Sequence, residues 1–391
     1  MENERGVIVN MLAINNAKIL TMNGKEYENG TILVKEGKIK KIGEDINIPE
    51  DTEVYDAAGK VIMPGMIDAH THLGVSEEGV GWEGADYNET SDPITPHLRA
   101  IDAINPEEEG LKDAYTHGIT SVMTGPGSAN IMGGENLVIK TKGKTIDQMV
   151  VKSPAGVKAA FGENPKRVYN EQNKSPKTRM AVAAIMRKTF MEAEDYLKKK
   201  ENAEKEDKPF DRDIKMETVA RVLDKEIPLK AHAHRADDIM TILRIAREFN
   251  IDVTLEHCTE GHKIAEEIAK SGFPAIVGPS LTTRAKVELK DRTYKTPAVL
   301  AEAGVKIALM SDHPVVPIHY LPVYAALAVR SGLDRSEALK AITINPAEIL
   351  GVDDRVGSLA VGKDADMVVF NGDPLSFDTE VETVFIDGER I

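Results

Sequence analysis

The middle of the chain alternates short apolar runs with stretches of helical periodicity. Runs such as 251–256 and 305–311 end at polar residues, and segments with apolar residues at helical spacing lie between them. Strand–helix alternation is typical of a parallel sheet. The expected strands are 61–67, 119–123, a hairpin of 136–141 and 147–152, then 156–161, 228–233, 251–256, 273–277 and 305–311. With the hairpin counted as one position, this α/β pattern predicts a TIM-like (β/α)8 barrel.

The two ends of the chain have a different pattern, in which short β-like segments are separated by glycine-containing turns. Two β-rich ends around a strand–helix middle predict a small β-sandwich built from both termini. We therefore expect a composite β-sandwich domain of residues 1–62 and 347–391 and a barrel domain of residues 63–346. The β-like segments are 17–21, 31–35, 38–43, 53–56, 365–370 and 381–386.

The stretch from about 177 to 226 is too long for one crossover between strands. Residues 179–200 have a helical pattern, and 198–208 are almost all charged, which is typical of a solvated segment. This pattern predicts a helical insertion that caps the site, makes an oligomer contact or is a plain surface excursion.

Composition narrows the class of protein. The 391 residues carry a formal net charge of -15, which argues against general binding to nucleic acid or a membrane surface. The single cysteine, Cys258, excludes an intrachain disulfide and a cysteine-based zinc site. No basic-then-apolar signal pattern opens the sequence, and no apolar run is long enough to span a membrane. We expect a cytoplasmic protein that acts on a small molecule, with a homo-oligomer left open.

Histidines follow several of the apolar runs, and the carboxylate of Asp312 follows the last one. His70 and His72 are two residues apart at the end of the first run, and His232 and His234 repeat that spacing. Side chains two apart on a strand point the same way, so each pair aims two imidazoles at one point. His257 ends a further run. Imidazole is the commonest metal ligand among side chains, so the pattern predicts a metal site at the carboxyl ends of the barrel strands.

These segments resemble the amidohydrolase superfamily, and they look most like its imidazolonepropionase-like branch, which also includes prolidase-like dipeptidases. The resemblance covers nearly the whole chain. It is carried by PGMIDAHTH (64–72), AHAHRA (231–236), the strand that ends in His257, SDHP (311–314) and the tail GKDADMVVFNGDP (362–374).

The resemblance implies a set of metal ligands. His70 and His72 match the ligands of the first strand. His232 matches the ligand of the fifth strand, and His257 matches the histidine of the sixth. Asp312 matches the aspartate of the last strand, which binds metal and moves protons in that family.

Two positions stay open at this point. His234 lies on the same strand face as His232 and is expected to contact substrate, with His232 the favoured ligand. Members with two metals bridge them with a carboxylated lysine or a glutamate, and Lys158 or Glu163 could fill that role. The two have opposite strand parity, so both cannot point inward without a bulge. The site would hold one or two divalent ions, most often zinc, with manganese, iron or cobalt as alternatives.

The implied function is hydrolysis of a carbon–nitrogen bond in an amide, cyclic amide or dipeptide through metal-activated water. Asp312 would act as general base and then general acid, and His257 and His234 would stabilise the developing oxyanion. The alternatives are a metal-dependent deaminase of a small heterocycle and a non-catalytic barrel used for binding or assembly.

Substrate contacts are expected in the long loop after the first strand, where His97 and Arg99 lie, because loops above a barrel often bind substrate. A dipeptide substrate would need a basic residue for its carboxylate. The candidates are Arg99, Arg167, Arg179 and Arg284.

Overall fold

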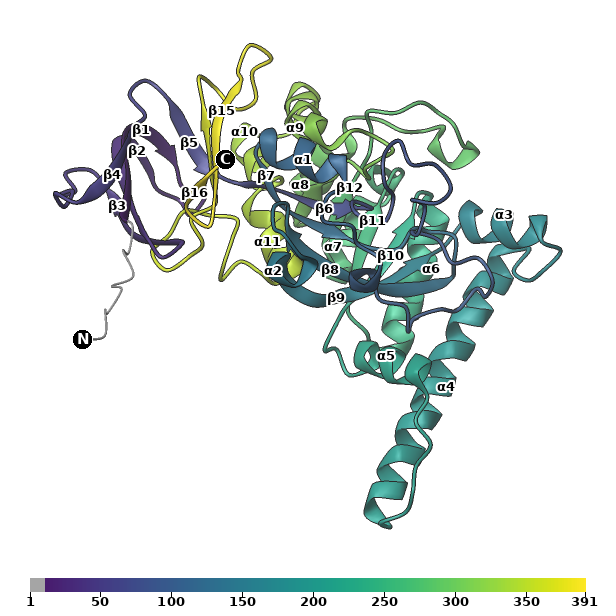
Figure 1. Cartoon of the computed structure of the whole chain (residues 1–391). Helices are drawn as coiled ribbons and strands as arrows, with labels where there is room; N and C mark the ends of the chain where they lie inside the picture. The colour runs from purple at the N-terminus through teal and green to yellow at the C-terminus, as the bar shows by residue number, and fades with distance from the viewer. Residues whose placement is uncertain (1–10) are drawn as a thin grey trace, which may run out of the picture.

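A computed structural model describes residues 11–391 and contains two sheets that lie side by side (Figure 1). The first sheet joins strands from both ends of the chain in the order β16-β15-β14-β5-β1-β2-β3, with β4 paired to β1. Residues 1–10 of the expected sandwich domain lie outside the described part. The strands are β1 (Met11–Leu20), β2 (Glu26–Lys35), β3 (Lys38–Gly43), β4 (Thr52–Asp56), β5 (Val61–Pro64), β14 (Met367–Phe370), β15 (Val381–Ile386) and β16 (Glu389–Arg390).

The second sheet has eight strands in sequential order and forms a nearly closed barrel, which confirms the predicted fold class. Its strands are β6 (Met66–Thr71), β7 (Ile119–Thr124), β8 (Met132–Lys140), β9 (Val150–Ala160), β10 (Leu229–Ala233), β11 (Val253–His257), β12 (Ala275–Val277) and β13 (Ile307–Leu309). Between the first and last strands, Ala341 accepts from Leu309 N (2.9 Å) and Ile342 accepts from Ile67 N (2.8 Å). This short segment therefore closes the ring.

The hairpin region differs from the expectation. Residues 147–149, expected in a strand, belong to helix α2 (Ile146–Met149), and the following strand β9 starts at Val150. Strand β8 runs antiparallel to both β7 and β9, so the barrel sheet is not wholly parallel. Only a short loop joins β7 to β8, and a parallel pair would need a long crossover between them.

The remaining helices surround the barrel or extend from it (Figure 1). They are α1 (Glu109–Thr116), α3 (Glu163–Glu171), α4 (Arg179–Lys205), α5 (Ile214–Leu223), α6 (Ala236–Phe249), α7 (Ala265–Ser271), α8 (Thr296–Glu302), α9 (Leu321–Arg330), α10 (Arg335–Lys340) and α11 (Ile344–Leu350). Helix α11 and the following turn to Val356 pack on barrel residues such as Ala69 and Ala308. No helix of the described part is long and apolar enough to cross a membrane.

The expected insertion forms α4 and α5. Thr178 caps α4 by accepting the N–H of Ala181 at 3.1 Å, and Phe190 packs on Phe249 of α6 with ring centroids 5.0 Å apart. The far half of α4 projects away from the barrel (Figure 1). None of the described residues of α4 or α5 lines the cavity beside the histidines, so the structure does not support a cap over the site.

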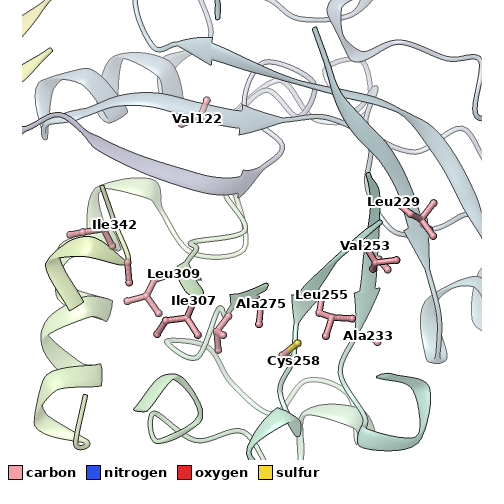
Figure 2. Packing of buried hydrophobic residues seen from close by; sticks show 14 of the residues in the cluster. Val122, Leu229, Ala233, Val253, Leu255, Cys258, Ala275, Ile307, Leu309 and Ile342 are labelled. Carbon is pink, nitrogen blue, oxygen red and sulfur yellow. The ribbon is translucent and has the colours of Figure 1, made fainter. Parts of the chain in front are cut away.

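Alternation along β10 separates an outward apolar face from an inward polar face. On β10, Leu229, Ala231 and Ala233 pack in the main apolar cluster, part of which Figure 2 shows. The intervening Lys230 and His232 are buried but are not part of that cluster. Because successive side chains on a strand point to opposite faces, the same strand builds the core and presents polar groups to the barrel interior.

The two sheets meet at Gly65, which links β5 to β6. A Cβ atom at this position would lie 2.0 Å from the Thr120 side-chain oxygen, so any larger residue would push the junction apart. Gly65 is the single residue between the end of β5 and the start of β6. Glycine therefore allows the close approach that joins the two sheets.

A buried ion network also joins them. The Lys140 side chain of β8 is 3% exposed and contacts Asp366 at 2.5 Å, Asp364 at 3.0 Å and Asp387 at 3.3 Å. These aspartates belong to the C-terminal part of the chain, so one barrel lysine neutralises carboxylates contributed by the segment that completes the first sheet.

Replacing Lys140 by Met should lower the free energy of unfolding by about 3–5 kcal/mol, because Asp366 would keep its charge in a buried position without a cation. Urea denaturation measures the change, with the exposed Lys144→Met as the matched control. A loss below about 1 kcal/mol would fit a surface ion pair and would contradict the proposed role of this network.

Candidate metal centre

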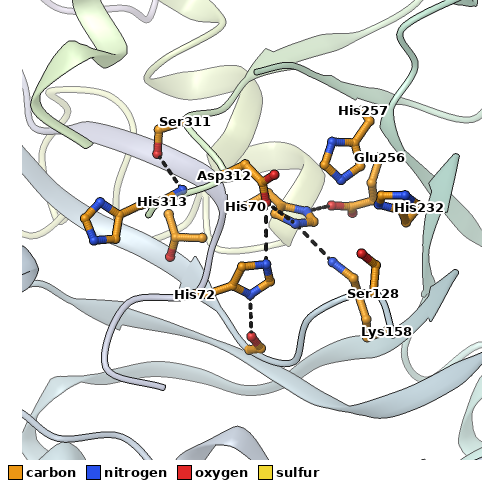
Figure 3. A network of polar contacts seen from close by, with 12 residues as sticks. His70, His72, Ser128, Lys158, His232, Glu256, His257, Ser311, Asp312 and His313 are labelled. Atoms are coloured by element: carbon orange, nitrogen blue, oxygen red, sulfur yellow. Dashed lines mark hydrogen bonds and ion pairs between the residues drawn. The ribbon is translucent and has the colours of Figure 1, made fainter. Parts of the chain in front are cut away.

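Seven of the residues singled out from the sequence gather inside the barrel, six of them in two groups. His70, His72 and Asp312 form one group, and His232, His234 and His257 form the other, with ligand atoms within 4.8 Å of one another in each. His257 links the two, since its ring centroid lies 5.1 Å from that of His70 and 4.2 Å from that of His232 (Figure 3). All six side chains are buried or nearly so.

His257 reaches the centre through a change in backbone direction. Strict alternation from the outward-facing Val253 and Leu255 would also turn His257 outward. Instead, His257 has φ 73° and Cys258 has φ 47°, in the left-handed region. Cys258 joins the apolar cluster while His257 faces the other histidines. Positive φ is unfavourable for non-glycine residues and is concentrated at functional sites.

Backbone carbonyls orient two of the imidazoles. His72 Nδ1 donates to the carbonyl of Gly125 (2.7 Å), and His257 Nδ1 donates to that of Gly278 (2.9 Å). A carbonyl can only accept, so in each neutral ring Nδ1 carries the proton and Nε2 keeps its lone pair. Both Nε2 atoms are thus available as ligand atoms.

His70 is oriented by a carboxylate that the sequence analysis did not single out. Its Nδ1 contacts Glu256, which is fully buried, and the other Glu256 oxygen accepts from the Thr254 hydroxyl at 2.7 Å. Burial alone would raise the pKa of Glu256, but the charges and hydrogen bond of its neighbours, His70 first, lower it to about 2. A carboxylate behind an imidazole is a common second layer of a metal site. Its position directly before His257 is the signal that could have revealed it.

The donor atoms fit a divalent metal ion. Nε2 of His70 lies 3.3 Å from Asp312 Oδ1, and Nε2 of His72 lies 3.5 Å from the same oxygen. Lone pairs that face one another at these distances repel unless a cation lies among them. Burial lowers the pKa of His232 and His257 well below the ordinary value, which keeps both rings uncharged. Imidazole and carboxylate together are the donor set of zinc and related ions.

Lys158 and Glu163 occupy different surroundings. Lys158 on β9 is 1% exposed, and its Nζ lies 3.0 Å from His70 Nε2. Glu163 begins α3 and lies in neither ligand group of the described residues. Its N–H donates to Glu288 at 3.1 Å. The geometry therefore brings Lys158, and not Glu163, to the centre.

Comparison of the chain with known protein families identifies the family to which it belongs. Residues 61–391 match the amidohydrolase family. The chain belongs to that family.

The solved structure of an amidohydrolase from Thermotoga maritima is 47% identical, covers 97% of this chain and 99% of its own, and superposes with a TM-score of 0.95. Imidazolonepropionase of Thermoplasma volcanium is 24% identical over 88% of this chain and 85% of its own length. Amidohydrolase tasK of Hapsidospora irregularis is 29% identical over 92% of this chain, and the match spans 39% of that protein. The resemblance to the imidazolonepropionase-like branch is confirmed.

Family membership also confirms the expected class of enzyme, a metal-dependent hydrolase that acts on carbon–nitrogen bonds of small molecules. A substrate of this enzyme class would bind in the cavity beside the centre.

The cavity of this amidohydrolase has a volume of about 410 Å³. Its wall includes His72, His232, His234, His257 and Asp312, together with Tyr87, Ser128, Asn164, Arg167 and Lys286. The sequence analysis named Arg167 among four arginines for a carboxylate but gave no role to Asn164, Ser128 or Lys286. Lys286 lies in an irregular loop, where no periodic pattern marks a side chain as facing the site.

His97 and Arg99 lie elsewhere. They line a neighbouring cavity of about 330 Å³, which shares Tyr87 and Asn88 with the first. Arg99 is engaged by Asp102 through two hydrogen bonds of 2.9 Å. The structure therefore does not bring either residue to the wall of the histidine-lined cavity.

Replacing Glu256 by Gln should weaken metal binding about 10–100-fold, because an amide keeps an acceptor for His70 but removes the charge that supports the ligand. Competition with a chelator at fixed pH measures the affinity. The exposed Glu266→Gln of α7 is the matched control. Unchanged affinity in the Glu256 variant would show that the contact with His70 has no bearing on the metal.

Proposed function

We propose that this amidohydrolase cleaves the C–N bond of a small amide at the centre formed by His70, His72, His232, His257 and Asp312. The observation that carries the proposal is convergence: side chains from separate strands, among them His72, His232 and Asp312, line one cavity. When bound there, a divalent cation supplies Lewis acidity, which lowers the pKa of water and polarises a carbonyl oxygen.

Asp312 carries the proton in this proposal. Its carboxylate lies at the edge of the cavity between two imidazoles and is the acidic group nearest to the ligand nitrogens of His70 and His72. It accepts the proton of the attacking water and passes it to the leaving nitrogen. Burial alone would raise the pKa of Asp312, but its neighbours, His257 first, hold it well below the ordinary range, so the carboxylate starts ionised.

His234 is assigned to the substrate. Burial lowers its pKa to about 3, so the ring is neutral, and its Nδ1 contacts the Thr259 hydroxyl at 2.8 Å. A neutral imidazole held in this way can donate a hydrogen bond to an oxygen that gains negative charge during attack. His232, next to it, remains the favoured metal ligand of the pair.

Two divalent ions, most often zinc, would be held by the histidines and Asp312, and Lys158, once carboxylated by carbon dioxide, would add an anionic ligand shared by both. Burial lowers the pKa of Lys158, which favours the neutral amine that reacts with carbon dioxide. The group of His70, His72 and Asp312 and the neighbouring His232 and His257 would each hold one ion, with His234 left for the substrate. A cytoplasmic location is also proposed, in keeping with a single cysteine that is buried and free.

Replacing Asp312 by Asn should lower kcat about 100- to 10,000-fold, because an amide cannot accept the proton of the nucleophile. Zinc content by elemental analysis should largely persist. The exposed Asp353→Asn serves as the control. A turnover within about tenfold of the parent would exclude Asp312 as the proton carrier.

Replacing Lys158 by Met should reduce bound zinc from two ions to one for each chain. Lys230 provides a matched control, since it pairs in register with Lys158 on the adjacent strand and is equally buried. The Lys230→Met protein should keep its metal. Equal zinc in the parent and the Lys158 variant, measured by elemental analysis of the purified proteins, would refute the bridging role.

A further inference from the structure

Two cationic side chains line the histidine-lined cavity, and neither has an acidic partner. Arg167 of α3 and Lys286 of the loop after β12 are both part of the wall. Among residues 11–391, no carboxylate lies within ion-pair distance of either cation. Of the described residues that line the cavity, Asp312 is the one with a carboxylate, and it belongs to the ligand set.

The other arginines considered for this role are engaged elsewhere. Arg179 pairs with Asp238 at 2.9 Å, and Arg284 donates to the carbonyl of Lys290 at 2.9 Å. Neither lines the cavity. Of the four arginines named from the sequence, Arg167 is thus the one at the site, and Lys286 joins it.

The side-chain amide of Asn164 lies between Lys286 and the histidines of the candidate metal centre. Its Nζ donates to Asn164 Oδ1 at 2.8 Å, and Asn164 Nδ2 lies 3.4 Å from His232 Nε2. The same amide nitrogen donates to the Ser128 hydroxyl at 2.7 Å. A group that replaces Asn164 as the partner of Lys286 would therefore lie within a few bonds of an atom held at the histidines.

The local charge favours an anion at this position. The nearby Glu288 is buried, accepts from Glu163 N and faces His234 at 3.8 Å, and burial raises its pKa although the charge of Lys286 acts to lower it. The ammonium of Lys286 lies near imidazoles that would bind a metal cation. Two positive charges at this separation repel, so an anion between them would lower the energy.

We propose that Lys286, with Asn164 and Arg167, forms the subsite for a carboxylate of the substrate. The substrate class is then a small amide that carries a free carboxylate a few bonds from the C–N bond to be cleaved. This inference rests on the proposed function. It moves the expected substrate contacts from the loop of His97 and Arg99 to α3 and the loop between β12 and α8.

The test compares matched compounds that differ only in the carboxylate. N-acetyl amino acids and dipeptides are offered to the zinc-loaded full-length enzyme, each as the free acid and as the C-terminal amide. Dissociation constants for N-acetyl-L-alanine and N-acetyl-L-alaninamide are measured by calorimetry on the zinc-loaded Asp312→Asn protein, in which binding is separated from turnover. Both measurements are repeated with Lys286→Gln, Arg167→Gln and, as a control on the same loop, Lys290→Gln.

We expect the free acids to be preferred about 10- to 100-fold in kcat/KM and in affinity, the range of a hydrogen-bonded ion pair. In Lys286→Gln the preference should fall through a higher KM for the acids, with kcat little changed and the amides unaffected. Arg167→Gln should show a smaller loss in the same direction, because its side chain is more exposed. Lys290→Gln should behave as the parent.

Equal binding of acid and amide, no binding of either compound, or a preference that survives in Lys286→Gln would overturn the subsite. Hydrolysis of acids and amides at equal rates would do the same while leaving the proposed hydrolase intact. Preferred binding of the acid without hydrolysis of any compound in the panel would support the subsite and count against the proposed function. The two proposals can therefore fail separately.

Discussion

The structure depends on one constraint: lone pairs from distant parts of the chain converge on a small buried volume. Nε2 of His70 and of His72 faces the same Asp312 oxygen at 3.3 and 3.5 Å. Such an arrangement is repulsive by itself. Hydrogen bonds on the far side of the rings hold it in place, because Glu256 accepts from His70 Nδ1 and the Gly125 carbonyl accepts from His72 Nδ1. A divalent cation resolves the repulsion, which is why the centre is best understood as a metal site.

The barrel supplies the rigidity that this convergence needs. Outward-facing residues such as Leu229 and Val253 pack in the main apolar cluster (Figure 2), which fixes the strand positions. Inward-facing residues can then be polar, because the strands are held from outside. His257 departs from this alternation, and the left-handed backbone there is a local strain that the surrounding packing sustains.

The charged side chains that line the cavity beside the centre are compensated to different degrees. Asp312 is balanced by the imidazoles around it, whereas Lys286 donates to the amide of Asn164 and forms no ion pair among the described residues. An unpaired ammonium next to a metal centre is not explained by the stability of the fold. In the proposed subsite, the carboxylate of a substrate would lie beside it.

The sequence by itself determined the class of fold, the strands that bear ligands and the identity of His70, His72, His232, His257 and Asp312 as a related set. The strands and the paired histidines follow from local rules: apolar periodicity specifies strands, and spacing of two residues places side chains on one face. The ligand set as a whole was implied by the family resemblance. The hairpin was predicted but was counted as one position of the barrel. In the structure β8 and β9 each take a position, and β9 also includes most of the expected strand 156–161, because strand length and pairing depend on how the chain returns to the sheet.

Only the tertiary structure separated Lys158 from Glu163 and brought Glu256 behind His70. It also turned His257 inward and placed Lys286 at the cavity in preference to Arg99. None of these outcomes is encoded by periodicity, since each depends on distances between segments far apart in the chain. Local pattern can name the residues that carry chemistry, but closure of the barrel decides which of them meet.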